Sequence, residues 1–445
     1  MKKIIYISMV LALSLACNQK EDDDLFGKTP TERLQEKTNE LRTELLSSPH
    51  GWKLTYQTDN QTYGGFTFVM KFDEQGQVAM VSDFDQSTIT QQQSHYQIKV
   101  GQGILLSFVT KNHIHNLADA ILGSRGKGFE GEFEFIYIGK EGEKLKFKTQ
   151  RIVKDIYLEK ATANDWNTIT NLLGSISVLD SDSYRHFVRI TNANGEIKDY
   201  KMSLNDLRYM TLRNFTNSSD QYKFGLIPTS KGLTLSPAPT FEGKTFNEFI
   251  WDANASPARY ITTIDGVTAE ILFSLYPKPE HVTDDYKDIE KIDNFIYINN
   301  LLKNTTLTSD SFRENLIKID DNKEFSRLEL AFGDNQECNI DLFYNFSGRT
   351  SILRIFLEYE IKDKKIYISL GKGNLASNNF PLWRAPENKA IYDKAMSVFS
   401  FFVSAGANGF YIEKQENKYT YSNVVYVLQS HSPSGYYFPV YSVFK

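Results

Sequence analysis

Bulky apolar residues alternate with polar ones over many short stretches of this chain, and this twofold period constrains the fold more than any other feature. The stretch GGFTFVMKF places Phe66, Phe68 and Met70 on one side of an extended segment, and DEQG follows at 73–76. Successive side chains point to opposite faces of a β-strand, so the pattern is typical of a strand with one buried face. We therefore expect an antiparallel hairpin that turns at 73–76.

The same alternation recurs along the chain, with short turn sequences between the alternating stretches. Turns are expected at 140–143, at Asn194-Gly195 and between Lys362 and Lys365. Long helices of the kind that connect parallel strands are absent from the first third, which argues against a doubly wound nucleotide-binding fold. The fold class we expect is mainly β (α+β), with antiparallel sheets in two or three domains, an N-terminal helix and one long C-terminal helix.

Three segments have helical rather than twofold periodicity. TPTE at 29–32 supplies a capping threonine, a proline in the first turn and a glutamate three residues later, so a helix should begin at Thr29 and stop near Ser48. A short helix is expected over 164–173, ending at Gly174. A long helix is expected over 387–404, with Gly406 closing it.

We expect the chain to divide at the polar stretch SVLDSDS, residues 177–183, and again near residue 284. The proposed parts are a signal peptide (1–16), an acidic tether (17–27), an N-terminal helix with an antiparallel β domain (28–176), a second β-rich region (183–284) and a C-terminal β-rich domain (285–445).

The first residues predict export. Met-Lys-Lys precedes an apolar run that ends at Ala16, which is typical of a secretory signal and shorter than the ~20 residues that a membrane-spanning helix needs. Ala16 before Cys17 resembles the lipobox of bacterial lipoproteins, although Ser14 stands where the usual pattern has leucine. The following KEDDD resembles the surface-export signal of Bacteroidota lipoproteins. These resemblances imply a lipid on Cys17 and a place in the outer membrane, facing the cell exterior. The alternatives are the inner leaflet of the outer membrane and an ordinary secreted protein.

Four stretches together resemble an uncharacterised family, a domain of unknown function found in Bacteroidota outer-membrane lipoproteins. They are SSPHGWKLTY, GGFTFVMKFDEQGQVAMVSD, LLSFVTKNHIHNLAD and GFEGEFEFIYIG, and the likeness covers roughly residues 25–165. Such proteins are associated with starch-utilisation-like TonB-dependent importers. The resemblance implies an accessory, ligand-capturing subunit. Its partners would be the TonB-dependent outer-membrane transporter, the transporter's lid lipoprotein, and an oligopeptide or glycan ligand, with a slight preference for peptide.

The charges and sequence motifs of the chain do not indicate a particular reaction or cofactor. The chain has 50 basic and 55 acidic residues and no block of five basic residues, so we expect no nucleic-acid partner. No H-E-x-x-H, G-x-S-x-G or C-x-x-C motif occurs, and we predict no catalytic residue and no cofactor. Paired carboxylates for hydrolysis are defined by their spacing in space, so a surface hydrolase stays open as an alternative, as does a purely structural subunit of the importer.

One weak metal candidate is present. On a strand, His113 and His115 would share a face, and Asp119 could supply a third zinc ligand. A hydrogen-bonded structural role for His115 is the preferred interpretation, so we predict no metal. Since Cys17 is expected to carry lipid, Cys338 has no partner, and no disulfide should support the fold.

Overall fold

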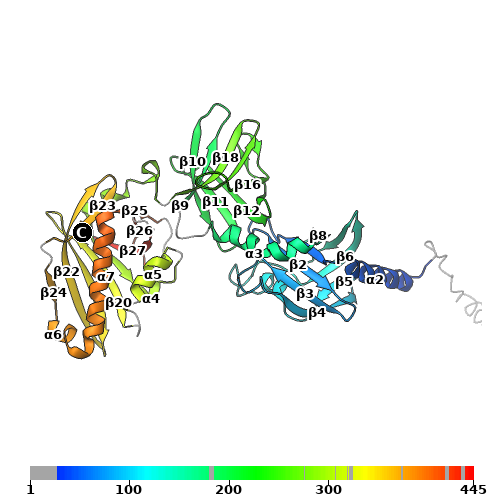
Figure 1. Ribbon diagram of the computed structural model, residues 1–445, viewed down its shortest axis with the longest axis horizontal. Coiled ribbons are helices and arrows are strands. Elements are labelled where there is room, and N and C mark those ends of the chain that lie inside the picture. The colour runs from blue at the N-terminus through cyan, green and yellow to red at the C-terminus, as the bar shows by residue number, and fades with distance from the viewer. Residues whose placement is uncertain are drawn as a thin grey trace, which may run out of the picture.

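The structure is a computed structural model that describes residues 28–179, 185–274, 276–305, 307–317, 319, 324–371, 374–415, 420–431 and 436–445. The expected signal peptide, Cys17 and the acidic tether lie outside the described residues. In the described part, no helix combines the length and apolarity needed to cross a membrane. Three β-rich bodies with antiparallel sheets follow one another along the chain (Figure 1), which confirms the expected fold class.

The first body is a closed barrel of eight strands, in which each strand pairs with its neighbour in sequence and β1 pairs with β8. The hairpin expected at 73–76 is confirmed between β2 and β3. The strands are β1 (Trp52–Tyr56), β2 (Phe66–Phe72), β3 (Gln77–Ser82), β4 (Gln92–Val100), β5 (Ile104–Phe108), β6 (Glu134–Glu141), β7 (Lys144–Lys148) and β8 (Asp155–Lys160).

The N-terminal helix α2 (Pro30–Ser47) confirms the expected cap, because Thr29 and Glu32 exchange the hydrogen bonds of a capping box. Leu41 and Leu45 are buried against the first barrel. The indole Nε1 of Trp52 donates to the carbonyl of Leu45 at 3.0 Å, which ties the end of the helix to the first strand.

The second body is also a closed barrel, and its first hairpin turns at Asn194-Gly195 as expected. Gly195 has a φ of +83°, which a glycine adopts without strain. Its strands are β9 (Arg185–Thr191), β10 (Ile197–Leu204), β11 (Tyr209–Asn214), β12 (Gln221–Thr229), β13 (Gly232–Ser236), β16 (Glu248–Asp252), β17 (Arg259–Ile264) and β18 (Val267–Ser274), with the small pair β14 (Thr240–Phe241) and β15 (Lys244–Thr245) beside them.

Helix α3 (Ala163–Ser177) joins the two barrels and is longer than expected, because it continues through Gly174. Ile169 and Leu172 pack on the first barrel, whereas Ile176 and Leu179 pack into the core of the second. This burial at both ends outweighs the tendency of glycine to end a helix. The described start of the expected linker at 177–183 is therefore part of a packed element, and residues 180–183 lie outside the described residues.

The third body is the C-terminal sheet, in which the end strand β21 also pairs with β22, the neighbour of the other end strand β24. Figure 1 shows α7 lying along this sheet. Its strands are β19 (Ile292–Ile298), β20 (Phe325–Phe332), β21 (Glu337–Phe346), β22 (Arg349–Lys362), β23 (Lys365–Ser369), β24 (Leu375–Ser377), β25 (Phe410–Lys414), β26 (Val425–Ser430) and β27 (Tyr437–Phe444), and its helices are α4 (Asn299–Leu302), α5 (Asp310–Ile317), α6 (Phe380–Trp383) and α7 (Lys389–Asn408).

The long C-terminal helix is confirmed, but its end differs from the sequence expectation. α7 runs past Gly406 to Asn408, and Gly409, at a φ of +83°, follows it. A Cβ added to Gly406 would lie 2.5 Å from the Cβ of Ile368 on β23. Gly406 is therefore required for close packing of the helix on the sheet, rather than to end the helix.

A buried ion pair fastens the second barrel to the first. The guanidinium of Arg208, in the turn before β11, lies 3.0 Å from the carboxylate of Asp83, and the two side chains are 4% and 0% exposed. Arg208 also donates to the carbonyl of Gly65 at 2.9 Å and lies over the ring of Phe66 at 4.2 Å. A backbone hydrogen bond from the N–H of Gly64 to the carbonyl of Leu207, at 2.8 Å, completes the junction.

Candidate ligand-binding cavity

A cavity of about 430 Å³ lies between the second barrel and the C-terminal sheet. Strands β9 and β10 line one side, strands β25, β26 and β27 line the other, and the connector at 276–283 closes part of the rim. Its volume falls within the ~300–1,000 Å³ that is typical of small-molecule sites, which often lie between domains. We take this cavity as the candidate site.

The C-terminal side of the cavity is built from one row of side chains. Gln429 on β26 lies directly opposite Tyr411 on β25 and opposite Tyr437 on β27. Residues that face each other on antiparallel strands share a face of the sheet, so the amide has an aromatic ring on each side. The alternate residues Leu428 and Phe438 point into the core of the C-terminal sheet. The twofold period of the strands therefore presents this row to the cavity.

Gln429 is polar, only 3% exposed and incompletely satisfied. Its amide oxygen Oε1 is buried and accepts no hydrogen bond from the described residues. Leaving a buried acceptor without a donor costs ~1–3 kcal/mol, so native structures retain very few such groups. A ligand whose N–H or O–H group reached this oxygen would remove this cost.

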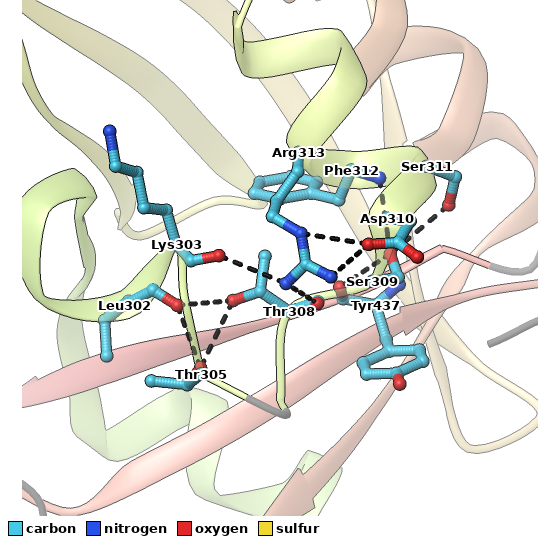
Figure 2. Close-up of polar contacts among 10 residues, drawn as sticks. All are labelled: Leu302, Lys303, Thr305, Thr308, Ser309, Asp310, Ser311, Phe312, Arg313 and Tyr437. Carbon is cyan, nitrogen blue, oxygen red and sulfur yellow. Dashed lines mark hydrogen bonds and ion pairs between the residues drawn. The ribbon is translucent and has the colours of Figure 1, made fainter. Parts of the chain in front are cut away.

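The turn before α5 fixes the position of Tyr437 (Figure 2). Ser309 is fully buried, its backbone N–H donates to the Tyr437 carbonyl at 3.0 Å, and its hydroxyl accepts from the Tyr437 N–H at 3.0 Å. Arg313 holds this turn by donating to the carbonyls of Thr308 at 2.6 Å and Lys303 at 3.1 Å. The Tyr437 ring points away from this network in Figure 2, and Tyr437 lines the cavity.

The wall of the second barrel carries charge and aromatic surface. Phe187 and Lys201 lie opposite each other on β9 and β10 and face outward. Lys201 forms an ion pair with Glu413 of β25, so this pair bridges the two bodies beside the cavity. Five aromatic side chains line the cavity in all, and they are Phe187, Phe215, Tyr276, Tyr411 and Tyr437.

The connector is held in place by His281. The imidazole stacks on Phe215 with centroids 4.0 Å apart, and its Nε2 lies 2.8 Å from Asp199. Arg189 binds both oxygens of Asp199, at 2.8 and 2.7 Å. Burial alone would raise the pKa of Asp199, but the hydrogen bonds from Arg189 and His281 outweigh burial and hold this pKa far below its usual value. Asp199 is therefore an ionised anchor for the connector.

Asp199, Glu280 and His281 are the one cluster in the described residues in which three potential metal-ligating atoms lie within 4.8 Å of one another. The guanidinium of Arg189 occupies both Asp199 oxygens, so a metal ion there would meet a fixed positive charge at hydrogen-bonding distance. The geometry fits an ion-pair network better than a cation site.

The structure does not bring the sequence-predicted metal candidates together, and these residues do not form the strand that would place His113 and His115 on one face. His113–Leu117 forms a 3-10 helix capped by Asn112, because Ile114 and Leu117 are both buried on one side of that turn. His113 Nε2 donates to the carbonyl of Thr90 at 2.9 Å, and His115 Nδ1 accepts from the N–H of Asn112 at 3.1 Å. Asp119 pairs instead with Lys111, at 3.5 Å.

Two carboxylates do meet on the C-terminal sheet, away from the cavity lining. Glu329 on β20 lies opposite Asp341 on β21. Arg354 binds Asp341 through both oxygens at 2.5 Å, and Arg327 lies 2.7 Å from Glu329. Burial raises the pKa of Glu329, and Arg327 opposes this rise. Each carboxylate is thus neutralised by its own arginine.

The first barrel offers no comparable space, since the gap between its inward-facing side chains does not admit a water molecule. Its aromatic residues fill the interior, as expected for a small eight-stranded barrel. Exposed aromatic residues in the described chain are spread over all three bodies: Phe133, Trp251, Phe356, Tyr421 and Phe444. None of these five residues lines the cavity.

Sequence analysis missed every residue of this cavity, because its walls come from segments more than 200 residues apart, such as β10 and β26. One local signal was available. VVYVLQS is apolar on both faces of an expected strand until Gln429 and Ser430, and polar residues in a doubly buried strand need an explanation.

Comparison with known proteins gives a family and no activity. No curated protein matches this chain. A solved structure described as "Crystal structure of lipopolysaccharide binding protein" shares 8% identity over 93% of this chain and 96% of that chain, with a TM-score of 0.13, which carries no argument about fold or function. The family model "Domain of unknown function (DUF4302)" matches residues 22–253. That match covers more than half of the sequence, and the chain therefore belongs to the DUF4302 family.

Proposed function

We propose that this chain is a lipid-anchored protein of the outer membrane that captures an oligopeptide or glycan in the cavity between the second barrel and the C-terminal sheet. The observation that carries this proposal is the buried, unpaired Oε1 of Gln429, placed between two tyrosines in a cavity of about 430 Å³. Folding alone does not explain why an acceptor should be kept there at a cost. A donor supplied by a ligand does.

The surrounding groups support capture rather than chance packing. Aromatic rings provide apolar contact area and preferred stacking faces for sugar rings or side chains. The Lys201–Glu413 ion pair and the His281–Asp199 pair hold the two walls and the connector in position before a ligand enters. A site that is already formed avoids part of the ordering cost of binding.

The Gln429→Leu variant should show opposite changes in stability and binding. Without ligand, its free energy of unfolding should rise by about 1 kcal/mol, because the unpaired acceptor is replaced by an apolar group of similar size. Urea unfolding measures this change. Oligopeptide or oligosaccharide mixtures should raise the melting temperature of the wild type and leave that of the variant unchanged.

The matched control is Gln97→Leu, on an exposed position of β4 in the first barrel, which should leave the ligand response intact. A Gln429→Leu variant that is less stable than the wild type and still responds to the same mixtures would contradict capture at this cavity.

We also propose that the protein serves as an accessory subunit of a starch-utilisation-like importer. Tethering the cavity to the membrane would raise the local ligand concentration near a TonB-dependent transporter. Purification from gently solubilised outer membranes should recover the transporter and its lid lipoprotein, identified by mass spectrometry. Recovery of this chain with neither subunit would overturn the importer assignment without affecting ligand capture.

A further inference from the structure

Two charged side chains of the cavity have no charged partner among the described residues. Lys278 lines the cavity from the connector, is half-buried and forms no ion pair; its ammonium lies 4.8 Å from the centre of the Phe187 ring. Asp206 lines the cavity at the turn after β10, is exposed and likewise lacks an ion pair among the residues that the structure describes.

The other charges that line the cavity are already balanced. Lys201 is paired with Glu413, and His281 with Asp199, which also binds Arg189. Glu280 is exposed and does not belong to the lining. The cavity thus presents one unbalanced cation, one unbalanced anion and, with Gln429, one unsatisfied acceptor.

Building on the capture function proposed above, we infer that the ligand is a short peptide with free termini. Its carboxylate pairs with Lys278, a backbone N–H donates to Oε1 of Gln429, and its terminal ammonium pairs with Asp206. A zwitterionic peptide supplies all three complementary groups, and the aromatic walls receive its side chains. A neutral glycan leaves both charges unmatched, and an acidic sugar matches Lys278 alone.

The surroundings of Lys278 favour recognition of an anion. The carbonyl of Lys278 accepts the N–H of His281 at 2.9 Å, which forms the turn Pro279–His281. His281 is in turn fixed by its stack on Phe215 and its bond to Asp199. The rings of Phe187 and His281 are in edge contact, with their centroids 4.8 Å apart, so the ring that the Lys278 ammonium contacts is itself packed. Lys278 therefore belongs to a turn whose position is fixed by packing and hydrogen bonds.

The test is calorimetric titration of the full-length protein with unblocked tripeptides of the form Ala-X-Ala, where X is each of the standard amino acids. The best of these peptides is then compared with its C-terminal amide, its N-acetyl form, maltotriose and a glucuronate-terminated disaccharide. Lys278→Met should weaken the unblocked peptide by about tenfold and leave the amide unaffected. Asp206→Asn should weaken the unblocked peptide by a few-fold, since Asp206 is exposed, and leave the N-acetyl form unaffected.

The matched control is Lys231→Met, an exposed lysine in the β12–β13 turn outside the cavity lining, which should not change any affinity. Binding of maltotriose or the disaccharide in preference to every tripeptide overturns the peptide assignment and leaves capture intact. Equal binding of the free peptide and its amide also overturns it. If no probe binds the wild type, both this inference and the capture function fail.

Discussion

Arg208→Met is expected to lower the free energy of unfolding by about 3–5 kcal/mol, because it leaves the carboxylate of Asp83 buried without its counter-charge. Asp83 has an exposed side-chain fraction of 0%, and its remaining partner is the N–H of Thr67, at 2.7 Å. Urea unfolding followed by tryptophan fluorescence measures the loss. Breaking this pair should also separate the transitions of the two barrels, since Arg208 contacts both of them.

The pH dependence of this variant follows from the same burial. Burial raises the pKa of Asp83, and Arg208 opposes that rise in the wild type. Without Arg208 the rise in this pKa is larger, because backbone hydrogen bonds such as that from Thr67 are then the remaining opposition. An acid whose pKa is higher in the folded state than in the unfolded state binds protons preferentially when folded. The difference in free energy of unfolding between the wild type and Arg208→Met should therefore become smaller as the pH falls from neutral.

Lys144→Met is the control for the loss of a positive charge. Its ion pair with Glu159 is exposed, with side-chain fractions of 51% and 44%, and exposed pairs contribute little to stability. The double variant Asp83→Leu with Arg208→Met should recover part of the lost stability, because neither buried charge remains. A loss below 1 kcal/mol for Arg208→Met alone would show that the junction does not depend on this pair.

Cys17→Ala is expected to abolish incorporation of labelled palmitate and to release the protein from the membrane fraction. Each buried acyl methylene contributes ~0.8 kcal/mol, and stable attachment requires more than one chain. Loss of the acylated residue therefore removes the whole anchor that we propose. The measurements are palmitate labelling, and protease digestion of intact cells, which should degrade the wild-type protein at the surface.

The matched control is Cys338→Ala, because Cys338 is the other cysteine of the chain. It is 4% exposed, and burial raises the pKa of its thiol to about 12, so it stays protonated and inaccessible to acylation. This variant should retain its label. Equal labelling of the wild type and Cys17→Ala would refute the proposed lipid anchor. Resistance of the wild type to protease on intact cells would refute its location at the cell surface.

Local chemistry predicted the elements of this fold well. The cap at Thr29 and the turns at Asn194-Gly195 and Lys362–Lys365 each depend on residues within a few positions of one another, and all were found where expected. Gly174 and Gly406 misled the prediction of helix ends, because packing against distant strands decided both.

Closure of the barrels and formation of the cavity could not be derived in this way. The pairing of β1 with β8 joins segments about a hundred residues apart. The twofold period of each strand shows which face is buried but does not identify the strand with which it pairs. The same limit hid the cavity, where Lys278, Asp206 and Gln429 converge from three separate parts of the chain. Each of them alone resembles an ordinary surface or strand residue.

The most direct test of ligand capture is hydrogen–deuterium exchange of the wild-type protein with and without a saturating mixture of unblocked tripeptides and neutral oligosaccharides. We predict slower exchange at the connector 276–283 and at the turn around Asn205 and Asp206, which border the cavity, and unchanged exchange throughout the first barrel. Unchanged exchange at both cavity segments, or protection confined to the first barrel, would contradict the account.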